Sequence, residues 1–205
     1  MVKKGYFITF EGADGCGKTT QSELVKKYLE GKGFDVIWTR EPGSKGLGQK
    51  IRELLLHYDG DVAPMCETFL FLADRAQNIE ENIKPAVAQG KVILCDRHTD
   101  STIAYQGFGR GKDIEHLNYL NNLATDTMKP DITFVYDVST DVAQTRVGSE
   151  KDRMESAGIE FHKKVRQGYL EIAKNEPDRV KVIDANNSIE QVFEDTKKIL
   201  DEMIF

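Results

Sequence analysis

Residues 12–19 read GADGCGKT and match the pattern G-x-x-x-x-G-K-[ST] without a gap. In such a loop, the glycines allow backbone N–H groups to turn towards phosphate oxygens, and the following helix adds the positive end of its dipole. Lys18 can neutralise charge on β- and γ-phosphates, and the hydroxyl of Thr19 can hold Mg²⁺. The spacing therefore predicts a site for the phosphates of a nucleotide and a magnesium ion.

The residues on either side give this loop the context that it needs. A short β-prone run at residues 6–10 precedes it, and a helical pattern follows it, with one apolar face made by Leu24, Val25, Tyr28 and Leu29. A strand, a glycine-rich loop and a helix in this order distinguish a phosphate-binding loop from a chance glycine-rich turn.

A second signal lies at residues 92–98, where an apolar run ends in Asp96 and Arg97. An acidic side chain at the end of a buried strand is placed to reach Mg²⁺, usually through water. Arg97 stands where a hydrolysing ATPase usually carries a glutamate that activates water, and arginine binds phosphate by its geometry. This favours a phosphate acceptor over water. The sequence also lacks the N-K-x-D motif of guanine-specific GTPases.

A third candidate is Arg40, which follows the apolar run 36–39 and precedes Pro42 and Gly43. Proline and glycine force the chain to turn, which leaves Arg40 at the carboxyl end of a strand. Taken alone, Arg40 would be an ordinary surface arginine. It gains interest because the carboxyl ends of parallel strands share one edge of a sheet, so we expect Arg40 and Arg97 on the same edge.

Residues 69–76 follow a helical pattern whose core stripe we predict to be Phe69, Leu72, Ala73 and Ala76. Phe71 and Arg75 lie one turn apart on nearly the opposite face. A planar base could stack on Phe71 and accept hydrogen bonds from Arg75. On spacing alone, packing of Phe71 beneath a neighbouring loop is the better interpretation.

Two further segments carry polar groups suited to nucleotides. In residues 96–107, the amide of Gln106 can donate and accept hydrogen bonds at once, as the edge of a pyrimidine requires. Residues 146–155 are charged and have the composition of a solvated loop. In a phosphoryl-transfer enzyme, such a loop could be a lid that brings cations over the phosphates.

The chain has 205 residues, a formal net charge of −6 and 40% hydrophobic residues, which indicates a globular protein. The acidic balance argues against binding to a nucleic acid polymer or to an acidic membrane surface, and no segment reaches membrane-spanning length. Three cysteines without a C-x-x-C pair indicate reduced thiols in a cytoplasmic protein and no zinc site.

Five apolar runs predict buried parallel strands at residues 6–10, 36–39, 92–95, 132–138 and 180–183. The helical stretches between them predict βαβ units and one doubly wound α/β domain over residues 1–205, with ligands at the carboxyl ends of the strands. The last helix is expected to begin with a capping box at Ser188 and Gln191. Its apolar stripe should consist of Ile189, Val192, Phe193, Thr196, Ile199, Leu200 and Met203.

Together these motifs resemble the thymidylate kinase family, which belongs to the P-loop nucleoside monophosphate kinases and makes dTDP from dTMP and ATP. The motifs occur in the family's order at residues 10–21, 39–43, 71–75, 96–107, 152–155 and 183–185. The resemblance implies a five-stranded parallel sheet surrounded by helices, a homodimer, and a lid at about residues 147–155. It also implies dTMP and ATP as substrates and Mg²⁺ as the cofactor.

The resemblance further implies which residues bind each group. ATP would contact Gly12, Ala13, Asp14, Gly15, Cys16, Gly17, Lys18, Thr19, Thr20 and Arg146. The ligands of Mg²⁺ would be Thr19 and Asp96. The residues that bind dTMP would be Asp14, Arg40, Phe71, Arg75, Arg97, Ser101, Tyr105 and Gln106. Catalysis would rest on Lys18, Arg97, Arg153 and Asp14.

Within this set, each residue has an implied role. Arg40 and Arg97 would grip the dTMP phosphate, and Arg146 would lie against adenine. Tyr105 would crowd the 2′ position of the sugar and disfavour a ribose, while Asp14 would approach the 3′-hydroxyl. Phe71 would stack on thymine, with two polar side chains at its edge, namely Arg75 and Gln106. Because Phe71 and Arg75 lie off the predicted core stripe, we expect either alanine variant to weaken dTMP binding with little change in stability.

The position of a catalytic arginine separates two branches of the family. One branch carries it in the P-loop, where this chain has Gly15, so the chain resembles the bacterial branch with the arginine in the lid. Arg153 matches that lid, whereas a second lid arginine is replaced by Gly148, for which Lys151 could compensate.

Two other functions stay open from the sequence. The first is a kinase for UMP or CMP, against which the base-edge residues and Tyr105 argue. The second is a P-loop switch or ATPase that signals to a partner protein. The pair Asp96 and Arg97, in place of Asp-Glu, argues against this class.

Overall fold

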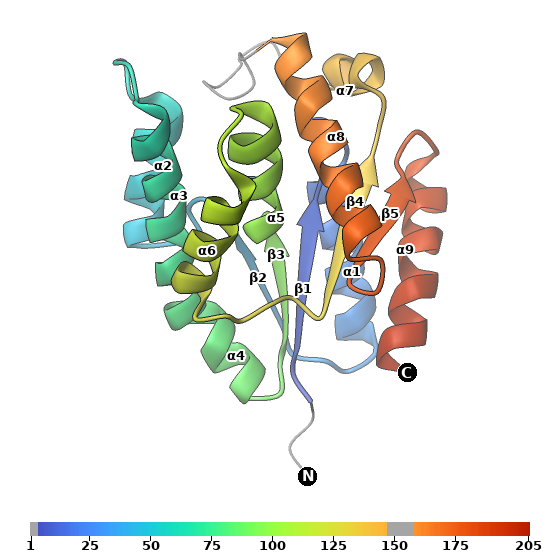
Figure 1. The fold of residues 1–205 in the computed structure, drawn as a ribbon. Helices are drawn as coiled ribbons and strands as arrows, with labels where there is room; N and C mark the ends of the chain where they lie inside the picture. The colour runs from blue at the N-terminus through green and yellow to red at the C-terminus, as the bar shows by residue number, and fades with distance from the viewer. Residues whose placement is uncertain (1–3, 147–157) are drawn as a thin grey trace.

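Five parallel strands form the sheet at the centre of the molecule, in the order β2-β3-β1-β4-β5 (Figure 1). The computed structural model describes residues 4–146 and 158–205. The strands are β1 (Tyr6–Glu11), β2 (Val36–Arg40), β3 (Val92–Asp96), β4 (Ile132–Asp137) and β5 (Val180–Asp184). The α/β class and the five-stranded parallel sheet predicted from the sequence are confirmed, and each predicted strand run matches an observed strand to within one residue at either end.

Helices connect the strands and cover both faces of the sheet. Within the described residues they are α1 (Lys18–Gly31), α2 (Leu47–His57), α3 (Pro64–Asn78), α4 (Lys84–Ala88), α5 (Thr99–Thr102), α6 (Ile114–Thr125), α7 (Thr140–Arg146), α8 (Ile159–Asn175) and α9 (Ile189–Ile204). Two π-helical segments, η1 (Ile79–Ile83) and η2 (Ile103–Gly109), continue α3 and α5.

The hydrophobic core lies on both faces of the sheet because apolar side chains of the strands point to both faces. On one face, Phe10 and Phe134 pack against Val25 of α1 and Leu200 of α9. On the other face, side chains of η1, η2 and α8 cover the strands. Figure 1 shows α8 lying across this face of the sheet. This arrangement leaves the carboxyl ends of the strands as the edge at which polar side chains gather.

The loop between β1 and α1 contains glycines with positive φ angles, which residues with side chains rarely adopt. Gly12 adopts a φ of +135°, and a Cβ there would lie 2.6 Å from the Tyr136 carbonyl oxygen. Gly17 adopts a left-handed conformation with a φ of 90° and caps α1, which begins at Lys18. The glycine spacing of the motif therefore serves both the close approach to β4 and the start of the helix.

The cap of α9 is confirmed on one side only. The Ser188 hydroxyl accepts a hydrogen bond from the Gln191 N–H at 3.3 Å, as the capping pattern predicts. The Gln191 side chain instead donates to Asp195 at 2.9 Å. Of the predicted stripe, Ile189 is exposed, and the other six side chains are buried or pack against the core.

The predicted core stripe of α3 is wrong in two of its four positions. Phe69 is 54% exposed and Ala73 is exposed, whereas Leu72 is buried. The face that α3 buries carries polar side chains, which are Glu67, Thr68, Asp74, Arg75 and Asn78. The hydrophobic pattern failed here because hydrogen-bonded polar groups, rather than apolar ones, turn this helix towards the sheet.

Candidate active site

The carboxyl-terminal ends of β2 and β3 and the loop after β1 open into a cleft with a volume of about 820 Å³. The predicted residues that line this cleft are Asp14, Gly15, Cys16, Gly17, Lys18, Thr19, Thr20, Arg40, Phe71, Arg75, Asp96, Arg97, Ser101, Tyr105, Gln106 and Arg146. The fold thus brings together side chains from both halves of the sequence.

Lys18 lies folded over the loop that precedes it. Its ammonium nitrogen donates to the carbonyl oxygens of Gly12 and Ala13, at 3.1 and 3.3 Å, and lies 3.7 Å from the Cys16 sulfur. Gly12 and Ala13 are buried beneath this contact and do not line the cleft. Lys18 is 8% exposed, so its charge is held at the loop without being sealed from the cleft.

Arg97 follows β3 in a strained backbone conformation with a φ of 68°, which a residue with a side chain rarely adopts. Its guanidinium pairs with the Asp14 carboxylate and lies 5.0 Å from the centre of the Tyr105 ring. The Tyr105 hydroxyl donates to the other Asp14 oxygen at 3.0 Å. Burial alone would raise the pKa of Asp14, but the charges of Arg97 and Lys18 outweigh it and hold that pKa at about 2.

Glu11 and Arg97 share two hydrogen-bond partners, the hydroxyls of Ser101 and Tyr169. Glu11 is fully buried at the end of β1, and its carboxylate accepts hydrogen bonds from the His98 and Ser101 N–H groups and from the Ser101 and Tyr169 hydroxyls. Arg97 in turn donates to both hydroxyls, at 3.3 and 3.2 Å. Burial, followed by the charge of Asp100, raises the pKa of Glu11 to about 7.

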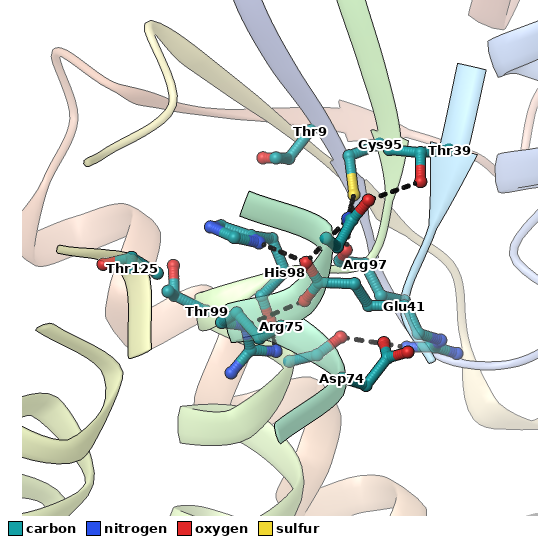
Figure 2. Close-up of polar contacts among 12 residues, drawn as sticks. Thr9, Thr39, Glu41, Asp74, Arg75, Cys95, Arg97, His98, Thr99 and Thr125 are labelled. Atoms are coloured by element: carbon teal, nitrogen blue, oxygen red, sulfur yellow. Dashed lines mark hydrogen bonds and ion pairs between the residues drawn. The ribbon is translucent and has the colours of Figure 1, made fainter. Parts of the chain in front are cut away.

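Arg75 of α3 is fully buried at the cleft and forms a hub of hydrogen bonds, of which Figure 2 shows the one to Glu41. Its Nε donates to Glu41 at 2.8 Å, and its Nη1 donates to Thr102 and Asn121 at 2.6 and 2.8 Å. Its Nη2 donates to the His98 carbonyl at 2.8 Å. Within the described residues one N–H of Nη2 has no acceptor, and Arg75 lines the cleft.

Glu41 is the counter-charge of this hub. Besides Arg75, it accepts a hydrogen bond from Asn78 at 3.0 Å and lies 3.0 Å from the His98 ring nitrogen Nδ1 (Figure 2). Burial alone would raise the pKa of Glu41, but His98 and Arg75 outweigh it and lower that pKa to about 2. The buried Arg75 is therefore paired rather than an isolated charge.

The residues that suit a magnesium ion lie together in the cleft. Thr19 and Asp96 both line it, and Asp96 Oδ1 is buried without a hydrogen-bond partner among the described residues. A hard cation with oxygen ligands would satisfy that atom, so the donor set fits Mg²⁺. Cys95 and His98 also lie near Glu41, but the oxygens of Glu41 are already occupied by Arg75, Asn78 and His98.

Two more predicted arginines line the cleft at different ends. Arg40 is paired in register with Asp96 across β2 and β3, and its Nε donates to the Gly43 carbonyl at 3.2 Å. Arg146, the last residue of α7, donates to the Ala185 carbonyl at 3.0 Å. Arg40 and Arg97 thus share one sheet edge, as the sequence predicts, while Arg146 lies near the loop after β5.

The predicted lid at about residues 147–155 falls outside the described residues. Arg153, Lys151 and Gly148 belong to that segment. Their roles therefore stay predictions.

Known proteins with similar sequences and structures identify the family of this chain. A family model described as thymidylate kinase matches residues 10–196. The chain belongs to the thymidylate kinase family. It is 47% identical over 193 residues to a thymidylate kinase of Bifidobacterium longum (strain DJO10A), covering 92% of this chain and 94% of the relative. It is also 47% identical over 189 residues to that of Sulfurihydrogenibium sp. (strain YO3AOP1), covering 92% and 93%.

A solved structure of a family member has the same fold. The crystal structure of thymidylate kinase from Ehrlichia chaffeensis matches with a TM-score of 0.79 and 38% identity, and the match covers 96% of this chain and 99% of that one. In this thymidylate kinase family member, none of the helices of residues 4–146 and 158–205 combines the length and the apolar character that crossing a membrane requires.

Three buried residues of this thymidylate kinase family member had no role assigned from the sequence. Glu11 and Glu41 stood within the motifs, and a carboxylate at the end of an apolar strand run could have identified both. Tyr169 gave no such signal, because its partner Glu11 lies 158 residues away in the sequence. Only the fold brings these two side chains together.

Asp74 gives this thymidylate kinase family member a testable pH dependence. Its Oδ1 accepts from the Gly43 N–H at 3.0 Å, its Oδ2 is buried without a partner among the described residues, and burial, then the charge of Glu41, raises its pKa to about 7. The folded state therefore holds a proton that the unfolded chain releases near pH 4, so stability falls as the pH rises from about 4 to 7, by roughly 1.4 kcal/mol for each unit of pKa difference.

Asp74→Asn removes this titration while it keeps an acceptor for Gly43. Urea unfolding at pH 5, 6, 7 and 8 is expected to show the variant gaining stability relative to the wild type as the pH rises. A constant difference across this range would contradict the raised pKa. Glu11 titrates in both proteins, so its effect cancels in the comparison.

Proposed function

We propose that this chain transfers the γ-phosphoryl group of ATP to dTMP and so forms dTDP and ADP. The observation that carries the proposal is one cleft that joins a phosphate-binding loop to a second anion site, at Arg40 and Arg97, and to a base-sized end lined by Phe71 and Arg75. Membership of the thymidylate kinase family supports it. The three free cysteines suit the reducing cytoplasm.

The proposed chemistry is positioning and charge neutralisation. An oxygen of the dTMP phosphate attacks the γ-phosphorus in line, a P–O bond forms there, and the bond from the γ-phosphorus to the β,γ-bridging oxygen breaks. Lys18 and Arg97 take up charge on the transferring group, with Arg153 of the proposed lid as the third cation. The acceptor phosphate is already an anion at neutral pH, so no strong general base is needed.

Magnesium would neutralise phosphate charge when bound, with Thr19 and Asp96 as its protein ligands. Asp14 has a separate role in the proposal. Its lowered pKa keeps it ionised, so it can orient Arg97 and accept a hydrogen bond from the sugar.

The test is a coupled assay for ADP formation with ATP, Mg²⁺ and a panel of nucleoside monophosphates. We expect dTMP to give the highest kcat/KM. A preference for UMP or CMP would replace the proposed substrate. Nucleotide binding without turnover of any monophosphate would instead indicate a P-loop switch.

Tyr105 is expected to exclude ribose from this site. Tyr105 is 6% exposed, its hydroxyl donates to Asp14, and its ring lies 5.0 Å from the Arg97 guanidinium. Tyr105→Ala should therefore narrow the kcat/KM preference for dTMP over its ribose analogue, by about tenfold or more. Tyr105→Phe keeps the ring and should keep the preference. If the wild type uses both sugars equally, Tyr105 does not have this role.

We also propose a homodimer formed through α2, α3 and α6. α3 contacts both α2 and α6, and the three helices expose large apolar side chains, namely Leu47, Leu54, Met65, Phe69, Ile114, Tyr119 and Leu123. Sedimentation of the wild type should give the mass of a dimer, and Phe69→Glu should shift it towards the monomer. A monomeric wild type at micromolar concentration would contradict this assembly.

A further inference from the structure

Glu67 of α3 fixes the direction of the Gln106 amide at the base end of the cleft. Gln106 Nε2 donates to Glu67 Oε1 at 3.1 Å, and the two residues are 2% and 1% exposed. An ionised carboxylate only accepts hydrogen bonds. The amide nitrogen of Gln106 must therefore face Glu67, and the amide oxygen must face away from it.

Arg110 pairs with the other oxygen of Glu67. Its Nη2 lies 3.5 Å from Glu67 Oε2, and its guanidinium lies 4.9 Å from the centre of the Phe161 ring. The guanidinium is thus a counter-charge to this buried carboxylate. The two oxygens of Glu67 thus have different neighbours: Arg110 faces one and the Gln106 amide faces the other.

The amide oxygen of Gln106 is the group that remains for a ligand. Gln106 lines the cleft, and its Oε1 neither receives a hydrogen bond from the described residues nor is sealed from solvent. Arg75 lines the same cleft, and one N–H of its Nη2 has no acceptor among the described residues. A base edge that matches this pair must place a hydrogen-bond donor beside an acceptor.

We infer that Glu67, by orienting Gln106, makes the cleft select pyrimidines that carry an N3–H, and reject cytosine. Thymine and uracil donate from N3 and accept at O4, whereas cytosine accepts at N3 and donates from its 4-amino group. The Gln106 oxygen would then oppose the cytosine N3 acceptor directly. This inference rests on the proposed function and adds a specificity-determining residue to it.

Glu67→Gln tests the inference because its effect on Gln106 has a defined direction. Arg110 is a donor, so the new amide at position 67 should turn its oxygen to Arg110 and its nitrogen to Gln106. Gln106 must then turn its own oxygen towards position 67 and present its nitrogen to the cleft. The change leaves size and shape nearly unchanged, removes the charge that faces Arg110, and reverses the hydrogen-bonding sense at Gln106.

The experiment compares kcat/KM for dTMP and dCMP in the wild type and in Glu67→Gln, with KM for ATP as a third readout. The dTMP-to-dCMP ratio should fall about tenfold or more, mainly through loss of dTMP use, while KM for ATP stays constant. Arg75 still presents a donor, so the variant should not become an efficient dCMP kinase. Asp74→Asn, a carboxyl-to-amide change on the same helix away from Gln106, should keep the ratio.

The outcomes separate the inference from the function on which it rests. A wild type that does not phosphorylate dTMP contradicts the proposed function. A wild type that does, with an unchanged ratio in Glu67→Gln, overturns the inference alone, and so does an equal fall for both substrates, which a merely structural role would give. If Glu67→Gln does not fold, Glu67→Met removes the acceptor at similar volume, and its ratio should also fall.

Discussion

Replacing Lys18 with alanine is expected to lower kcat for phosphoryl transfer by roughly 10²–10³-fold or more, with the protein still folded. The lysine is the cation that the phosphate-binding loop directs into the cleft, and its loss leaves the transferring charge without that partner. Folding should survive because the Nζ contacts are to two loop carbonyls and the Cys16 sulfur, and water in the cleft can replace them.

Single-turnover transfer at saturating nucleotide is the decisive measurement, with a thermal melt as the check on folding. Lys26→Ala is the matched control, because Lys26 lies on the same helix in an exposed pair with Glu30. It should leave both the rate and the melting temperature nearly unchanged. A rate close to wild type in a folded Lys18→Ala protein would contradict the phosphate-binding assignment of the loop.

The sheet and one half of the site could be predicted because local sequence encodes them. Buried parallel strands are continuous apolar runs, and a residue directly after such a run must lie at the carboxyl edge of the sheet. Arg40, Asp96 and Arg97 were placed in this way, and the structure aligns Arg40 with Asp96 in register. The glycine-rich loop needed only its own spacing and its two flanking elements.

The buried polar interior of the site could not be predicted, because its partners are distant in sequence. Arg75 meets Glu41, 34 residues earlier, and Asn121, 46 residues later. A pattern of hydrophobic residues assigns every arginine to the surface, whereas Arg75 is buried. The predicted stripe through Phe69 and Ala73 was therefore placed on the wrong side of α3. The partners of Arg75, such as Glu41 and Asn121, can be identified only from the folded structure.

Arg75→Ala is expected to lower the free energy of unfolding by about 3–5 kcal/mol, the usual effect of removing one partner from a buried ion pair. The sequence predicts little change, and the structure reverses that expectation. Among the described residues, Glu41 would be left as a buried carboxylate with Asn78 and His98 as its hydrogen-bond partners. Thr102 and Asn121 would also lose the donor that Arg75 supplies. A cavity of arginine size adds to the loss.

Urea unfolding of the variant and of a double-mutant cycle can isolate this effect. Glu41→Gln removes the stranded charge, so the double variant Arg75→Ala with Glu41→Gln should lose less stability than the two single losses added together. Arg166→Ala is the control, because its pair with Asp137 is partly exposed and should contribute only about 0–1 kcal/mol. If Arg75→Ala is as mild as this control, the hub does not hold α3 to the sheet. A raised KM for dTMP would then be the only effect of Arg75→Ala, and Arg75 would serve binding alone.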